Sequence, residues 1–164
     1  MGSMALRSAM GADGPEPGGA GLRLQISSSA TEVRAALGQV TEALGRGGHD
    51  ARARSCAELV LAEALNNIVE HAYAGQDLGR ITLRLQGAPG KIHLELRDRG
   101  RPMPGLALPE GRLKPLGHDG DLAEGGFGWY LIRRLATEVS YRRDGRENVL
   151  RLVLVSGPES GERG

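Results

Sequence analysis

The clearest pattern along the chain runs from Ala51 to Tyr73, where apolar residues recur at the three- and four-residue intervals of an amphipathic helix. Adjacent asparagines in this stretch lower helix propensity, because their amides compete with the backbone for hydrogen bonds. The side opposite the apolar stripe therefore either has a function beyond helix stability or simply faces solvent. The apolar stripe consists of Ala57, Leu61, Ala64, Leu65, Ile68 and Ala72, and the polar side carries Glu63, Asn66, Asn67, Glu70 and His71.

Two elements are predicted before this helix. Residues 22–26 alternate between apolar and polar, which is the period of a half-buried strand. Ser29 and Glu32 then have the spacing of a capping box, and the helix that follows is expected to end at Gly45, Gly47 and Gly48. Asp50 is the predicted N-cap of the central helix, and Gly75 its stop.

The second half of the chain predicts four strands and one helix. Residues 81–85 and 92–96 alternate around a Gly/Pro turn and indicate an antiparallel hairpin. Apolar residues at 131, 132, 135 and 139 have helical spacing. A strand is expected from Val139, a turn at Asp144-Gly145, and a strand at 149–155 that is apolar enough for the middle of a covered sheet.

The order of these elements predicts an α+β fold with helices on one face of a largely antiparallel sheet. We expect one domain at 22–156, a disordered leader at 1–21 and a flexible tail at 157–164. The first residues, Met1-Gly2-Ser3-Met4, are typical of a cloning remnant in front of a native start at Met4. Residues 103–125 have no period, and so long a loop is usually a lid, a binding loop or disordered.

Charge and composition exclude several classes of function. The 21 basic and 20 acidic residues give a net charge of +1, which argues against nucleic acid or an anionic membrane as a partner. Cys56 is the single cysteine, so an internal disulfide and a cysteine-based metal site are excluded. No apolar run is long enough to span a bilayer and no signal peptide precedes the domain, so we expect a cytoplasmic protein.

Three separated pieces suggest a nucleotide site. Gly126 and Gly128 stand at the start of the third helix, where free N–H groups and the positive dipole end can hold phosphate. Asp98 ends a strand two positions before Gly100, so its carboxylate can accept from an exocyclic amine while the glycine lets a flat ring approach. The alternatives are a tight turn before a closely packed helix for the glycine pair, and an ordinary turn aspartate for Asp98.

The central helix supplies the third piece. Asn67 offers one oxygen to Mg²⁺, an ion that prefers phosphate oxygens and water as its other ligands. Glu63 lies one helical turn away and is placed to act as the base toward a hydroxyl or a water that attacks a terminal phosphate.

Taken together, residues from about 22 to 155 resemble the small bacterial anti-sigma factor serine/threonine kinases of the RsbW and SpoIIAB type, within the GHKL superfamily. The resemblance rests on three motifs: Glu63-Ala64-x-x-Asn67-x-x-x-His71-x-Tyr73, Asp98-x-Gly100, and Gly126-x-Gly128 followed by Leu131-Ile132. It implies a Bergerat-type ATP-binding sandwich, ATP and Mg²⁺ as cofactors, and a homodimer that binds a sigma factor and phosphorylates a STAS-type anti-anti-sigma protein.

The same resemblance implies a role for each site residue. Glu63 corresponds to the catalytic base, Asn67 to the magnesium ligand and Asp98 to the carboxylate that selects adenine. Gly100 would flank the base, and the remaining two positions, Gly126 and Gly128, would serve the phosphates.

Two positions depart from the family pattern. Pro102 stands where the adenine motif commonly continues to a second glycine, and Glu124 stands where some relatives place an arginine that reaches the terminal phosphate. The resemblance makes a protein kinase the first hypothesis. The two departures favour the alternative, a nucleotide-gated module that binds a partner without transferring phosphate. The catalytic domain of a histidine kinase ranks last, because the chain is too short to carry a dimerisation helix pair as well.

Overall fold

The sheet of this computed structural model has five strands, and all of its neighbouring strands are antiparallel, in the order β1-β2-β3-β5-β4. The structure describes residues 21–76, 78–111 and 126–156. The strands are β1 Gly21–Ser27, β2 Arg80–Ala88, β3 Lys91–Asp98, β4 Glu138–Asp144 and β5 Glu147–Val155. The predicted leader and tail, residues 112–125 of the long loop, and Glu124 with them, lie outside the described residues.

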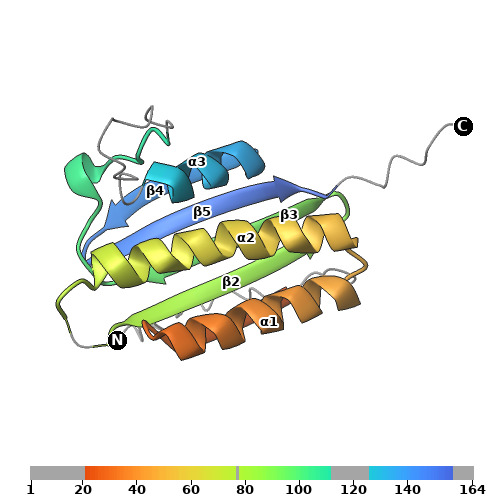
Figure 1. Cartoon of the computed structure of the whole chain (residues 1–164), viewed down its shortest axis with the longest axis horizontal. Helices are drawn as coiled ribbons and strands as arrows, with labels where there is room; N and C mark the ends of the chain where they lie inside the picture. Colours follow the sequence, from red (N-terminus) through yellow and green to blue (C-terminus); the bar gives the residue numbers. More distant parts are fainter. Residues whose placement is uncertain (1–20, 77, 112–125, 157–164) are drawn as a thin grey trace, which may run out of the picture.

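Three helices lie side by side over one face of this sheet (Figure 1). They are α1 Ala30–Arg46, α2 Ala51–Asn67 and α3 Gly126–Leu135. The core lies between the two layers, and its largest fully buried side chains include Leu61, Leu65, Leu83, Leu94, Leu96, Ile132 and Leu152. The predicted α+β class, with helices on one face of an antiparallel sheet, is confirmed.

The predicted helix starts are confirmed by their caps. The Ser29 hydroxyl accepts a hydrogen bond from the N–H of Glu32 at 3.2 Å, and the Asp50 carboxylate accepts from the N–H of Ala53 at 2.7 Å. The predicted end of α1 among Gly45, Gly47 and Gly48 is confirmed, because the helix ends at Arg46 and Gly47 is its C-cap. The strand predicted from Val139 is also confirmed, since β4 contains this residue and α3 ends at Leu135.

The prediction of one regular helix from Ala51 to Tyr73 is wrong in its last turn. The α-helix ends at Asn67, and the turn Ile68–Ala72 is π-helical, with the N–H of Tyr73 bonded to the carbonyl of Ile68 at 3.0 Å. A π-turn admits one extra residue without disturbing the apolar face, and such turns are frequent at functional sites. This turn meets the chain just after β3, because the carbonyl of Ala72 accepts from the N–H of Arg101.

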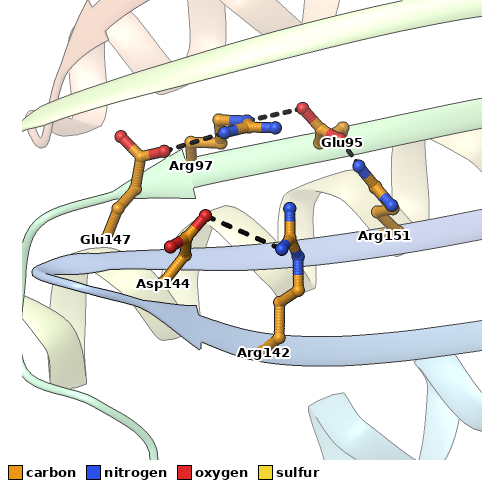
Figure 2. A network of polar contacts seen from close by, with 6 residues as sticks. All are labelled: Glu95, Arg97, Arg142, Asp144, Glu147 and Arg151. Atoms are coloured by element: carbon orange, nitrogen blue, oxygen red, sulfur yellow. Dashed lines mark hydrogen bonds and ion pairs between the residues drawn. The ribbon is translucent and has the colours of Figure 1, made fainter.

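The other face of the sheet carries no helix in the described part of the chain (Figure 1). Figure 2 shows the ion pairs on this face. Two of them, Arg97–Glu147 and Arg151–Glu95, join β3 to β5, whereas Arg97–Glu95 lies within β3 and Arg142–Asp144 lies within β4. No helix among the described residues is both long and apolar enough to cross a membrane.

Candidate nucleotide-binding site

A cavity of about 420 Å³ lies between the end of α2, the π-turn, the end of β3 and the first residues of the long loop. Its walls are mainly apolar, with Trp129 of α3 on one side. Its lining includes Ala64, Asn67, Ile68, His71, Asp98, Pro102, Met103, Trp129, Tyr141, Asn148 and Leu150. The cavity is of the size and kind that binds small molecules: apolar walls with a few fixed polar groups.

Asp98 is the buried acid of this cavity, with 5% of its surface exposed. Its Oδ1 accepts two hydrogen bonds, from the N–H of Gly100 at 2.9 Å and from the side-chain amide of Asn148 at 2.8 Å. Burial raises the pKa of Asp98, and the two hydrogen bonds and the charge of Arg143 oppose that rise. Both of these hydrogen bonds go to Oδ1, so the second oxygen, Oδ2, can accept a hydrogen bond from a ligand in the cavity.

Gly100 lies against the π-turn. A Cβ atom at this position would be 2.5 Å from the carbonyl oxygen of Ala72, and the next residue, Arg101, donates its N–H to that same oxygen at 2.8 Å. Close packing of two backbone segments is thus reason enough for a glycine here. The prediction that Gly100 admits a flat ring stays a prediction beside this packing requirement.

Asn67 ends α2 on the cavity wall. Its side-chain nitrogen is fully buried and has no hydrogen-bond partner in the described structure. A buried amide without a partner costs free energy, and a half-turn of the amide would present its oxygen instead. The described residues contain no group of three His, Cys, Asp or Glu that could hold a metal ion. The unpartnered side chain of Asn67 on the cavity wall fits the role of a single protein ligand to a Mg²⁺ that phosphate and water would otherwise hold.

Glu63 lies one turn before Asn67, beside the cavity rather than among its lining residues. Its Oε2 is 2.6 Å from the point where a Cβ of Gly128 would stand. Gly128 is in the first turn of α3, which begins at Gly126, so the fold brings the carboxylate of α2 to the start of α3. This close approach explains the glycine at 128, because any side chain there would displace Glu63.

The sequence analysis missed the residues behind Asp98. Asn148 of β5 stands opposite Asp98 in the strand register and is itself buried. Its side-chain oxygen accepts from the hydroxyl of Tyr141 at 2.7 Å and from the guanidinium of Arg143 at 2.9 Å. The Tyr141 hydroxyl accepts in turn from the N–H of Met103 at 3.0 Å, where the loop begins. The available signal was an asparagine directly before the apolar run 149–155.

Tyr73, at the end of the helical motif, fixes the neighbouring strand ends. Its hydroxyl donates to the carbonyl of Arg80 at 2.8 Å and accepts from the N–H of Arg99 at 2.8 Å. Burial is the main cause that raises the pKa of this hydroxyl. Gly79 lies against the ring, where a Cβ would be 2.1 Å from it. Tyr73 thus holds the start of β2 and the end of β3 in place beneath the cavity.

The match to a known family agrees with this geometry. The family described as the histidine kinase-like ATPase domain matches residues 26–154, which is well over half of the chain. The chain belongs to this family. Membership of this family implies that the chain binds ATP.

One relative in sequence and one in structure show which members of this family the chain is similar to. The chain is 33% identical over 140 residues to the serine/threonine-protein kinase BtrW of Bordetella bronchiseptica, which covers 84% of this chain and 95% of that protein. Its fold is similar to a crystal structure of the RsbU and RsbW domains of a Mycobacterium tuberculosis protein, with a TM-score of 0.59 and 19% identity. That match covers 84% of this chain and 32% of the other, and it shows the fold alone. The predicted resemblance to RsbW-type GHKL proteins is confirmed.

Proposed function

We propose that this protein is an ATP- and Mg²⁺-dependent serine/threonine kinase and anti-sigma regulatory factor, which binds a sigma factor and phosphorylates a STAS-type anti-anti-sigma protein. One observation carries the proposal: Asn67, whose buried side-chain nitrogen lacks a partner among the described residues, and the buried acid Asp98 line the same cavity. The name of BtrW, a serine/threonine-protein kinase, supports transfer to a protein hydroxyl.

Each residue has a role that its position allows. Asp98 accepts from the exocyclic amine of adenine through Oδ2, since Oδ1 is already occupied by two donors. The N–H groups of Gly126 and Gly128, at the start of α3, donate to phosphate oxygens. Asn67 supplies one oxygen to Mg²⁺, which neutralises charge on the phosphates when it is bound.

Glu63 is the base of the proposed transfer. Its carboxylate accepts the proton of the substrate hydroxyl as that oxygen bonds to the terminal phosphorus of ATP, and ADP leaves with the electrons of the broken bond. The position of Glu63 against Gly128 supports this role, because the phosphates held by the α3 N-terminus would lie next to its carboxylate.

A nucleotide-gated module that binds its partner without transfer is the second candidate. Pro102 favours it, because this proline lines the cavity where the family motif commonly has a glycine, and it fixes the backbone there. In this case ATP would bind and change the affinity for the partner, while the partner would remain unmodified.

The deciding experiment measures the mass of a STAS-type protein after incubation with the purified protein, ATP and Mg²⁺. For the wild-type protein we expect the mass of the substrate to increase by one phosphate. In Glu63→Ala the rate of this phosphorylation should fall by at least about 100-fold, while the affinity for ATP changes little. Glu58→Ala, which removes an exposed glutamate from the same helix, is the matched control and should transfer normally. Normal transfer by Glu63→Ala would refute the base, and ATP binding without any transfer would favour the module.

Three further predictions concern the homodimer, the sigma factor and the location in the cell, and the first two follow from the resemblance alone. A homodimer is tested by sedimentation of the purified protein, and sigma factor binding by co-purification with and without ATP. A cytoplasmic location is tested by fractionation of cells that express the protein.

A further inference from the structure

The hydrogen bonds behind Asp98 have a fixed direction. A guanidinium group can only donate, so the bond of 2.9 Å from Arg143 makes the contacted atom of Asn148 its oxygen. The amide nitrogen therefore points the other way, where it lies 2.8 Å from Asp98 Oδ1. The orientation of Asn148 is assigned by its partners, and Arg143 is the partner whose polarity cannot reverse.

The backbone holds Asn148 in the same orientation. Its amide nitrogen also donates to the carbonyl of Arg101 at 3.0 Å and lies 3.4 Å from that of Gly100. A reversed amide would set its oxygen against these carbonyls and against Asp98. Because Oδ1 of Asp98 also accepts from the N–H of Gly100, a proton that binds this carboxyl must go to Oδ2, the oxygen left for a ligand.

We propose that Asn148 and Arg143 are positioning residues that keep Asp98 an acceptor, and thereby set the preference of the cavity for adenine over purines that carry a carbonyl in place of the exocyclic amine. The inference rests on the proposed function, because it assumes that adenine meets Asp98. An ionised Asp98 accepts from the amine of adenine. A protonated Asp98 would donate from Oδ2 to the carbonyl of hypoxanthine held in the same pose.

This support is needed because burial works against it. Desolvation favours the protonated form of Asp98, and the nearby Glu147 favours it further. Arg143 opposes both through its charge and through Asn148. The other ionisable groups around the site are Tyr73 and Arg99 at the strand ends, and His71, Arg101 and Tyr141 on the cavity wall.

The test is titration calorimetry of ATP and ITP from about pH 5 to about pH 8, on the full chain and on variants whose folding is checked by circular dichroism. Asn148→Val removes the donor to Asp98, and Arg143→Met removes the charge and the donor to Asn148. Arg142→Met is the matched control, because Arg142 neighbours Arg143 but is paired with Asp144 on the outer face of the sheet.

We expect the wild-type protein to prefer ATP, with a preference that falls on acidification. The pH at the midpoint of that fall should rise by about one to two units in Asn148→Val and by about one unit in Arg143→Met. Each unit corresponds to an about tenfold lower preference for ATP over ITP at a pH within the fall. Arg142→Met should leave the midpoint unchanged.

Three results of the binding measurements overturn the inference. If the wild-type protein binds ATP but the midpoints do not move in a folded variant, Asn148 and Arg143 only support the fold. Equal weakening of ATP and ITP has the same meaning. If Asn148→Val fails to fold, Arg143→Met decides. If the folded wild-type protein binds no ATP, the proposed function fails first and the inference with it.

Discussion

Strands β3 and β5 carry polar groups on both faces, and these groups are buried on one face and partly exposed on the other. On the helix side, Asp98 and Asn148 stand opposite each other in a buried pair. On the outer side, Glu95 and Arg151 stand opposite each other in a partly exposed ion pair, joined by Arg97 (Figure 2). Alternation along a strand is enough to separate the two networks, although they share the same backbone.

The pKa values of Asp98 and Glu95 shift in opposite directions. Burial raises the pKa of Asp98, so the folded state binds this proton more tightly, and ionisation of Asp98 costs stability as pH rises through its folded pKa. Burial would also raise the pKa of Glu95, but hydrogen bonds from Arg97 and Arg151 hold it below its usual range. Ionised Glu95 thus stabilises the fold at neutral pH. Ionised Asp98 lowers the stability of the fold, at a site where a ligand would bind.

Asp98→Asn should have the largest effect of the substitutions that test this comparison, and the effect should be on ATP affinity. We expect ATP affinity to fall by about 100-fold or more, because a charge-assisted acceptor for the amine is lost. The free energy of unfolding at neutral pH should not fall, since the cost of a buried charge is removed. Calorimetry gives the affinity and urea denaturation the stability. A large loss of stability in parallel would show that Asp98 is a structural residue.

Tyr141→Phe should have the next largest effect. The N–H of Met103 loses its acceptor and the Asn148 side chain loses one of its two donors, which we expect to cost about 1–2 kcal/mol of unfolding free energy. Urea denaturation measures it. The control is Tyr130→Phe, whose ring stacks on Phe127 near the start of α3. Equal stability of the two variants would contradict the importance of this hydrogen bond.

Glu95→Gln tests the outer network. We expect a loss of about 0.5–1 kcal/mol at neutral pH, since the pair is partly exposed and screened by salt. The folded pKa of Glu95 is lowered, so the loss should be fully present above the usual value of 4.5 and shrink as pH falls through the folded pKa. Urea denaturation at neutral and acid pH checks this. A loss that grows on acidification would reverse the assignment.

Arg142→Ala should have the smallest effect. The Arg142–Asp144 pair is 3.6 Å apart, with 54% and 65% of the two side chains exposed, so its removal should change the free energy of unfolding by less than about 0.5 kcal/mol. A loss as large as that of Glu95→Gln would mean that the outer face acts as one cooperative network.

Most of the fold followed from the sequence, because alternation and helical spacing report directly which side of each element is buried. The starts of α1 and α2 followed from single capping residues, Ser29 and Asp50. The π-turn after Asn67 did not, since it inserts one residue within one turn and leaves the apolar stripe almost unchanged. Periodicity averages over several turns and does not resolve such a local change.

The candidate site followed only in part. Asp98 and the glycines stand next to helix or strand ends, where their neighbours in the sequence indicate a use. Tyr141, Arg143 and Asn148 gain their meaning from the pairing of β5 with β3 and β4, which places them behind Asp98. The register between strands is fixed by the whole sheet, so a local pattern can single out Asn148 but cannot show that these residues meet Asp98.

The contact between Gly100 and Ala72 limits what evolution can do at this point. The obstacle to a side chain at position 100 is a backbone oxygen, which every residue carries, so no substitution at position 72 can make room. A descendant that abandoned nucleotides would still need this glycine, or a shift of the backbone beside it. The side-chain nitrogen of Asn67 has no hydrogen-bond partner among the described residues, so the fold places no such requirement on that position. In a family of such chains, loss of the asparagine would therefore record the loss of ligand long before the glycine did.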